Sequence, residues 1–290
     1  VWRLDKFVHE RYHPHNPRMV YCDVSSLDSC RRAIREALPE FVVHLAAIAS
    51  TDSIMYNEPE RMIDVTFKGT MNISMALSSC AKENQYKSYP KQFIFASSSE
   101  VYGAAANPPF TEETEPHPNN IYAVSKWASE KHLRYWSQET EIPVTVMRNF
   151  NTYGNLHYQR TLIDRATKEM LDGAKMVKLG NPDTIRDWEF VDDHADSYLT
   201  VIGNQKAYGE TFNFCRGESY TIRETVDRIM DATDYTGEVE WGTGHPRPSD
   251  VPLLHGDPSK AQQVLGWEAK YNLTQGLEAY VSRLKEHARQ

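Results

Sequence analysis

The sequence has few cysteines and no long apolar run, and both absences exclude whole classes of protein. No CxxC pair occurs among its four cysteines, so neither a disulfide framework nor a zinc site is expected. No stretch reaches the roughly 18 apolar residues that a membrane span needs, and the first ten residues, VWRLDKFVHE, are too charged for a signal peptide. These features predict a protein of the reducing cytoplasm. The cysteines are Cys22, Cys30, Cys80 and Cys215.

The chain also has no excess of positive charge. Its 32 Lys and Arg residues face 40 Asp and Glu residues, which leaves a net charge of -8. This balance gives no reason to expect nucleic acid or an acidic membrane surface as a partner. His9, His13 and His15 lie close together in HERYHPHN, but a solvated loop explains them, and we predict no metal site.

The sequence has no GxxGxxG motif, yet its pattern is that of an α/β protein. Short runs rich in Val, Ile and Phe alternate with helical patterns, which is typical of βαβ units and a parallel sheet. The predicted strands are 18–24, 41–47, 91–97 and 144–150, and the helices between them are 27–38, 60–81 and 121–138. Ser26 is the expected N-cap of the first helix, and Asn119-Asn120 starts the third. We predict a Rossmann-like, doubly wound parallel sheet over residues 1–150.

The pattern changes after Asn151, where the elements become shorter. Helices are predicted at 158–173, near 192–202 and at 222–232, strands at 176–180, 211–215 and 238–242, and two more helices at the C-terminus. Residues 151–290 are therefore predicted to form a smaller α+β region that interleaves with the first.

One strand ends in an unusual group of polar residues. In FIFASSSEVYG, residues 93–103, an apolar run is followed by Ser97, Ser98, Ser99 and Glu100. Ligands of open parallel sheets bind beyond the carboxyl ends of the strands, so these side chains are placed to line a site. A polar turn with an N-capping serine explains the same letters equally well.

A tyrosine and a lysine follow on the next predicted helix. Tyr122 and Lys126 in YAVSK stand four residues apart and share a helix face. Among 16 tyrosines such a spacing arises by chance, and a solvated pair is its simplest explanation. The order of the features is more informative, because the polar strand end, Gly103 and a loop precede the helix.

That order, together with other stretches, resembles the extended short-chain dehydrogenase/reductase family, whose members are NAD-dependent epimerases and dehydratases of nucleotide sugars. The chain looks most like the 4,6-dehydratases, and among these the GDP-mannose type. The resemblance covers nearly the whole chain. The stretches that carry it are RMVYCDVSS, HLAA, FASSSEVYG, YAVSK, RNFNTYG, LGNPDTIRDWEFVDD and RPSDVPLLHGDPSKAQQVLGW.

The resemblance implies a catalytic role for five residues. Tyr122 would take the proton of the sugar C4 hydroxyl, and Ser98 would hold the same oxygen. Lys126 would lower the pKa of Tyr122, because a nearby ammonium favours the phenolate. The new C4 ketone acidifies the C5 proton, for which Glu100 is the expected base, and Ser99 or Glu100 would protonate the C6 hydroxyl as it leaves.

The resemblance also implies which residues bind NAD or NADP and the nucleotide-diphosphate sugar. Residues 1–150 would bind the dinucleotide and residues 151–290 the sugar nucleotide, in a homodimer or homotetramer. The implied cofactor residues are Asp23, Val24, Leu45, Ala46 and Ala47, together with Tyr122 and Lys126. The implied substrate residues are Asn151, Arg186, Arg247 and Asp250.

The absent glycine loop is the largest departure from the family. The pyrophosphate of a dinucleotide normally lies on that loop, so we expect an N-terminal βαβ segment of about forty residues to precede Val1. A 4-epimerase or a UDP-glucuronate decarboxylase on the same scaffold is an alternative function. A cofactor-free binding module is a third.

Overall fold

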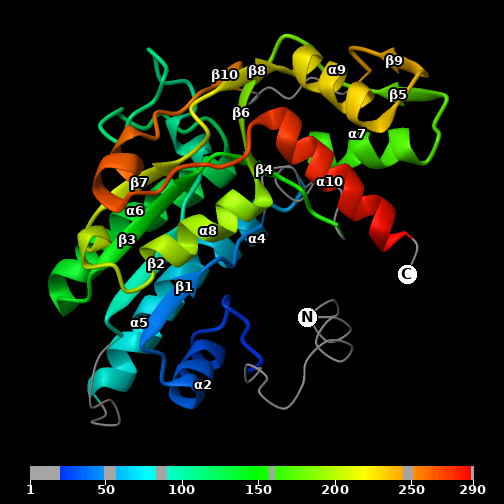
Figure 1. The fold of residues 1–290 in the computed structure, drawn as a ribbon. Coiled ribbons are helices and arrows are strands. Elements are labelled where there is room, and N and C mark those ends of the chain that lie inside the picture. The colour runs from blue at the N-terminus through cyan, green and yellow to red at the C-terminus, as the bar shows by residue number, and fades with distance from the viewer. Residues whose placement is uncertain (1–19, 49–56, 83–89, 157–160, 244–250, 289–290) are drawn as a thin grey trace.

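The computed structural model describes residues 20–48, 57–82, 90–156, 161–243 and 251–288. A sheet of four parallel strands forms its centre, in the order β1 (Phe41–His44), β2 (Gln92–Ala96), β3 (Val144–Asn149) and β7 (Thr211–Phe214). Every neighbouring pair is parallel, so all four carboxyl ends lie at one edge (Figure 1). This agrees with the predicted Rossmann-like fold.

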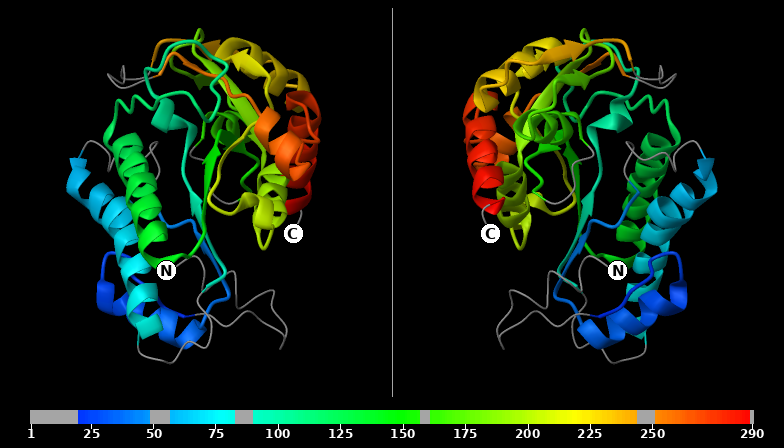
Figure 2. Two further views of the ribbon diagram at one scale, coloured as in Figure 1. Left: turned by 90° about the vertical axis from the view of Figure 1, so that its left-hand side faces the viewer. Right: turned by 90° about the vertical axis from the view of Figure 1, so that its right-hand side faces the viewer.

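Three helices cover one face of the sheet (Figure 2). They are α2 (Leu27–Ala37), α5 (Gly69–Lys82) and α6 (Ile121–Thr140). The side chains of Ser26 and Asn120 cap α2 and α6 by accepting a backbone N–H of the first turn, as the sequence predicts for both positions. Beneath these helices an apolar core centres on Phe93, Phe95 and Trp136.

The other face packs against segments from the second half of the chain. Helix α8 (Val191–Val201) and the π-helix η4 (Ala261–Leu265) lie on this side, with the short 3-10 helix η3 (Gln205–Ala207) before β7. Phe214 and Trp267 meet edge to face there, with ring centroids 4.9 Å apart. Residues beyond 150 thus supply both a strand and the cover of the central sheet.

A second lobe lies beside the carboxyl edge of the sheet (Figure 1). Its strands form one sheet of β4, β6, β8 and β10 and a separate pair, β5 with β9. Its helices pack around Tyr153, Phe190 and Tyr280. The strands are β4 (Asn151–Tyr153), β5 (Met176–Lys178), β6 (Ile185–Phe190), β8 (Ser219–Thr221), β9 (Glu238–Glu240) and β10 (Leu253–Leu254), and the helices are α7 (Leu162–Leu171), α9 (Ile222–Thr233) and α10 (Leu273–His287).

Three elements differ from their predictions. The helix predicted at 60–81 is α4 (Pro59–Ile63), a π-helical turn η1 (Asp64–Lys68) and α5 in succession. The strand predicted at 18–24 does not form over the described part, because the backbone of Asp23 and Val24 bonds to the side chains of Ser29 and Asn72 instead of a strand. Only α10 is a regular helix at the C-terminus, since η4 is a single π-helical turn.

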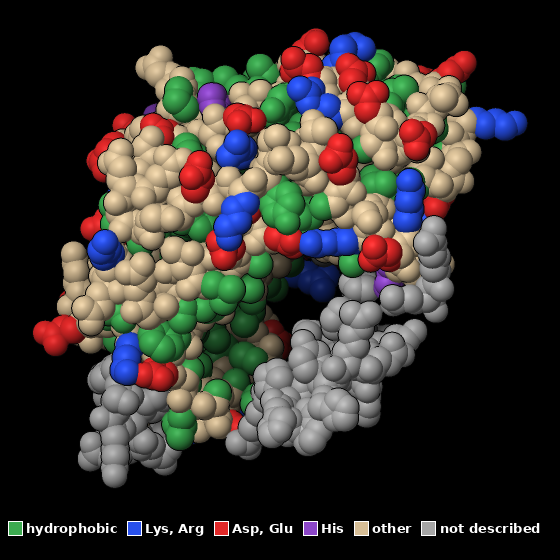
Figure 3. All heavy atoms as spheres, viewed as in Figure 1, with side chains coloured by type: hydrophobic (Ala, Val, Ile, Leu, Met, Phe, Trp, Pro, Cys, Tyr) green, Lys and Arg blue, Asp and Glu red, His purple; other side chains and the backbone are tan. Residues whose placement is uncertain are grey.

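One hollow of the surface is apolar (Figure 3). Among the described residues, Leu45 after β1 and Leu199 on α8 expose 58% and 72% of their surface.

No described helix is both long and apolar enough to cross a bilayer.

Candidate active site

The polar residues after β2 form a tight turn at the carboxyl edge of the central sheet. Ser98 caps the 3-10 helix η2 (Ser99–Tyr102) by accepting the backbone N–H of Glu100 at 3.2 Å. Gly103 then has a φ of +51°, and a Cβ there would lie 2.0 Å from the carbonyl oxygen of His117. Only glycine fits this close approach, which connects η2 to the loop leading to α6.

Tyr122 and Lys126 both lie on the face of α6 that meets this turn. The Lys126 ammonium donates to the carbonyl oxygen of Ala96 at 2.5 Å and lies 5.7 Å from the centre of the Tyr122 ring. The side chain of Ser98 lies close enough to Tyr122 to favour its phenolate. The structure therefore brings together the tyrosine, the lysine and the first of the predicted hydroxyls.

Glu100 joins the same group through Asn120. The side-chain amide of Asn120 donates to Glu100 Oε2 at 2.9 Å, while its Oδ1 accepts the backbone N–H of Ala123 at 2.8 Å. Asn120 thus caps α6 and orients the expected C5 base. The sequence showed only the capping role, because the second bond spans twenty residues of loop.

Ser99 lies deeper than the other predicted residues. Only 2% of its surface is exposed, whereas Glu100 and Tyr122 are half-buried. A fully buried hydroxyl at the base of the turn is poorly placed to reach a sugar C6 hydroxyl. Of the two acids considered from the sequence, Glu100 is the more accessible.

The protonation of the tyrosine and lysine differs from the expectation. Burial and the negative charge of Glu100 raise the pKa of Tyr122, and the nearby side chain of Ser98 only partly opposes this. Burial lowers the pKa of Lys126 to about 8, with Glu130 acting in the opposite direction. The predicted lowering of the tyrosine pKa is therefore not found in this state, because desolvation of the phenolate is the largest effect on this pKa.

The predicted cofactor residues other than Tyr122 and Lys126 lie in two segments, one before α2 and one after β1. Asp23 is exposed, and hydrogen bonds from the side chain and backbone of Ser25 lower the pKa of its carboxyl. Val24 contacts Gly69, where a Cβ would come within 2.9 Å of the valine side chain. Leu45, Ala46 and Ala47 directly follow β1 at the carboxyl edge of the sheet, and the two alanines are half-buried.

Two of the four predicted substrate residues are described. Asn151 begins β4, and its Oδ1 is buried without a hydrogen-bond partner among the described residues. Arg186 lies on the neighbouring strand β6, half-buried, with Nη1 donating to the carbonyl oxygen of Ile185 at 2.8 Å. Arg247 and Asp250 lie outside the described residues, as do His9, His13 and His15.

Sequence analysis did not predict a polar cluster that lies near Asn151. Glu189 Oε2 lies 2.9 Å from His194 Nδ1, which also contacts the Thr152 hydroxyl at 3.1 Å. Asn149 donates to the Tyr198 hydroxyl at 2.9 Å. Burial raises the pKa of Glu189, although the positive charge of His194 opposes it. In the sequence, only the alternation of charged and aromatic residues in RDWEF, residues 186–190, could have indicated this cluster.

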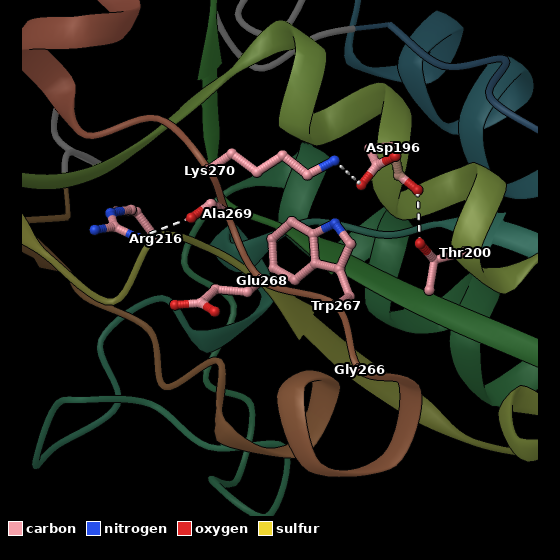
Figure 4. A pocket seen from close by; sticks show the side chains of 8 residues that line it. All are labelled: Asp196, Thr200, Arg216, Gly266, Trp267, Glu268, Ala269 and Lys270. Atoms are coloured by element: carbon pink, nitrogen blue, oxygen red, sulfur yellow. Dashed lines mark hydrogen bonds and ion pairs between the residues drawn. The ribbon is translucent and has the colours of Figure 1, made fainter.

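A pocket between α8 and the segment after η4 lies apart from this chemistry (Figure 4). Lys270 closes one side by an ion pair with Asp196 at 3.0 Å, and Arg216 bonds to the carbonyl oxygen of Ala269 at 2.8 Å. None of the predicted site residues lines it, so we assign it no part in the reaction.

Comparison with known proteins agrees with this geometry. The family model described as GDP-mannose 4,6 dehydratase matches residues 1–280. The chain belongs to the GDP-mannose 4,6-dehydratase family. It is 28% identical over 260 residues to GDP-6-deoxy-D-mannose reductase of Pseudomonas aeruginosa, covering 87% of this chain and 83% of that protein. It is also 28% identical over 300 residues to dTDP-glucose 4,6-dehydratase 1 of Escherichia coli, covering 91% and 79%.

Solved structures of this family's relatives share the fold. UDP-glucose 4-epimerase of Thermotoga maritima, solved with UDP-glucose, superposes with a TM-score of 0.83 at 26% identity over 98% of this chain and 94% of that one. The RMD structure from Pseudomonas aeruginosa, a complex with NADPH, gives 0.81 at 26% identity over 99% and 95%. The predicted family, fold class and NAD(P)-dependent enzyme class are confirmed. The preference for GDP-mannose stays a prediction.

The site residues fit part of a dinucleotide. The small side chains after β1 allow close approach, and Lys126 and Tyr122 face the carboxyl edge of the sheet. The sequence contains no GxxGxxG loop, and the described residues offer no other glycine-rich cradle for the pyrophosphate.

Proposed function

We propose that this enzyme converts GDP-mannose to a GDP-4-keto-6-deoxyhexose. The observation that carries the proposal is the position of Glu100, whose charge acts on Tyr122 and whose carboxylate is oriented by Asn120. Oxidation at C4 needs one base, whereas dehydration needs a second acid–base group at C5 and C6. A carboxylate beside the tyrosine supplies that second group.

The protein's residues divide the steps between them. The nicotinamide, when bound, supplies the hydride acceptor and a positive charge that favours the phenolate of Tyr122. Tyr122 takes the proton from the C4 hydroxyl, and Ser98 holds that oxygen. Glu100 removes the C5 proton and passes a proton to the leaving C6 hydroxyl. Hydride would return from the bound nicotinamide to C6, and the proton that Tyr122 took from the C4 hydroxyl would restore C5, so that the sugar loses one water overall.

The two lobes have separate tasks in this proposal. Residues 1–150 hold the dinucleotide through Asp23, Val24 and the segment after β1. Residues 151–290 hold the sugar nucleotide through Asn151, Arg186, Arg247 and Asp250, because arginine side chains suit bidentate binding of a diphosphate. We place the enzyme in the cytoplasm, since all four cysteines are free thiols.

Product analysis separates this function from its alternatives. The purified enzyme is incubated with GDP-mannose, dTDP-glucose, UDP-glucose or UDP-glucuronate, each with NAD or NADP, and the products are identified by mass and NMR. We expect a product of GDP-mannose that has lost one water. An epimer of unchanged mass or a pentose with carbon dioxide would replace the proposal by an alternative, and absence of any bound or usable cofactor would favour a binding module.

We also propose that the enzyme forms a homodimer through α5 and α6. These helices pack side by side and expose Met75, Val124 and Tyr135 by 43%, 45% and 61%. Large apolar side chains on neighbouring helices suit a helix–helix interface. Sedimentation of the wild type should give a dimer or tetramer and Val124→Glu a smaller species. A wild-type monomer would disprove this assembly.

A further inference from the structure

Two consecutive residues at the end of β2 bond to α6 at positions one helical turn apart. The bonds join Ala96 to Lys126 and Ser97 to Glu130, and the next residue, Ser98, lies beside Tyr122 one turn earlier. Tyr122 and Lys126 are the proposed catalytic residues. Glu130 lies one turn further along the helix and has no role in the reaction described so far.

Glu130 is also held by a buried arginine on β3. Arg148 donates from Nη2 to Glu130 Oε2 at 2.9 Å and from Nε to Oε1 at 3.2 Å. The side chains of Glu130 and Arg148 are 0% and 2% exposed. Desolvation makes a buried ion pair a weak source of net stability, so its presence beside the site calls for another explanation.

The guanidinium of Arg148 also bonds to the 3-10 helix η2, which bears Glu100. Arg148 Nη1 donates to the Tyr102 hydroxyl at 3.1 Å, and Tyr102 in turn donates to Asn213 Oδ1 at 2.6 Å. Tyr102 is the last residue of η2, which carries Ser99 and Glu100. One ion pair therefore connects the helix that bears Tyr122 and Lys126 with the turn that bears the second acid–base group.

We propose that Glu130 and Arg148 are positioning residues that hold Tyr122 and Lys126 in register with Glu100 and keep the lysine cationic. This inference rests on the proposed function. Among the described residues, the groups that face Lys126 are Glu130 and Tyr122 from α6 and His44 from β1. Burial lowers the pKa of His44 to about 3, so its ring is neutral. The carboxylate of Glu130 is thus the negative charge that opposes the desolvation of Lys126.

Loss of this carboxylate should change how Lys126 titrates. Lys126 favours the phenolate of Tyr122 only in its ammonium form, so activity should fall as pH rises through the pKa of Lys126, which is about 8. In Glu130→Gln this pKa should drop, and the basic limb of the kcat profile should move to lower pH. At pH 8 we expect kcat to fall about tenfold or more with little change in KM.

The control is a buried polar residue near the amino end of the neighbouring strand β3. Thr145 is 0% exposed, accepts from Gln92 Nε2 at 2.9 Å and donates to the carbonyl oxygen of Ala207 at 2.5 Å. Thr145→Val removes comparable buried bonds away from Lys126. It should lower stability without moving the titration of the lysine.

The experiment follows the ε-carbon NMR signal of Lys126, assigned by its loss in Lys126→Met, against pH in the whole enzyme. Wild type, Glu130→Gln, Ser97→Ala and Thr145→Val are compared, and kcat is measured over the same range. Ser97→Ala should shift the signal in the same direction and keeps the test available if Glu130→Gln does not fold. The NMR titration needs no turnover, so it is independent of whether GDP-mannose is the substrate.

A double variant separates position from stability. Glu130→Leu combined with Arg148→Met replaces the pair by apolar side chains, a change that often leaves stability intact. We expect this variant to fold and to lose at least tenfold in kcat. An unchanged kcat and pH profile in the double variant, or an unchanged Lys126 titration in both Glu130→Gln and Ser97→Ala, would overturn the proposal.

Discussion

The negative charge of Glu100 acts against the first step of the proposed reaction but is required in the second. A substitution at Glu100 should therefore separate the two steps. The carboxylate disfavours the phenolate of Tyr122, yet in the proposed reaction the same carboxylate is needed once the C4 ketone has formed. The Glu100→Gln variant should therefore oxidise the sugar at C4 and then stop before water is eliminated. Reduced nicotinamide should accumulate in amounts close to those of the enzyme, while turnover falls about 10²- to 10⁴-fold.

Tyr122→Phe is the matched control for that variant. It removes the first base, so neither reduced nicotinamide nor product should form. Stopped-flow absorbance and product mass are measured on the same samples. Full dehydratase activity in Glu100→Gln would remove Glu100 from the mechanism.

The buried ring of His44 should make the free energy of unfolding depend on pH. Its ring is 4% exposed, stacks on Phe95 and contacts the Thr70 hydroxyl at 3.1 Å, and its pKa is about 3. Since the unfolded chain binds this proton near pH 6.5, the stability that His44 contributes is complete above that pH. It should be lost as pH falls from about 6.5 toward 3.

The corresponding measurement is the free energy of unfolding against pH in wild type and His44→Gln. The wild-type curve should fall more steeply with acid, because the variant lacks the titrating ring. Parallel curves over this range would show that His44 is not held neutral by the fold.

At the scale of elements, the start of α6 both caps a helix and orients a base. Asn120→Ala should lose the cap at a cost of about 1 kcal/mol as well as the bond to Glu100. Asn120→Asp keeps a capping oxygen but removes the N–H donor, so its stability should stay close to wild type. Its kcat should fall about tenfold, as expected for losing a hydrogen bond to a charged group.

Asn272 provides the control for the cap. It caps α10 by accepting the N–H of Gln275 at 2.9 Å, in the other lobe. Asn272→Ala should cost about as much stability as Asn120→Ala and leave kcat unchanged. Chemical denaturation and steady-state kinetics check both results. A normal kcat in Asn120→Asp would show that the amide does not orient Glu100.

Local chemistry explains which elements were predictable. The starts of α2 and α6 follow from capping side chains at Ser26 and Asn120, and β2 follows from an apolar run, so each is encoded within a few residues. The bond between Asn120 and Glu100 and the pairing of Glu130 with Arg148 depend on how strands and helices assemble. The raised pKa of Tyr122 depends on burial, which the sequence pattern around it does not specify.

For the whole molecule, the family and the α/β architecture followed from motifs in the right order along the chain. The strand predicted before α2 did not, because Asp23 and Val24 bond to side chains of α2 and α5. Sequence analysis predicts that the two regions interleave, but the pairing of β7 with β3 that joins them depends on how distant strands assemble. The proposed dehydratase reaction requires that one nicotinamide, when bound, carries hydride from C4 to C6 of the same sugar.

Transfer of a label within one sugar tests this requirement most directly. GDP-mannose carrying deuterium at C4 is turned over with unlabelled cofactor, and the product is examined by NMR and mass spectrometry. We predict a 4-keto-6-deoxy sugar with the deuterium at C6. Deuterium that appears in free cofactor or solvent, or that stays at C4 of a sugar that has not lost water, would contradict the account.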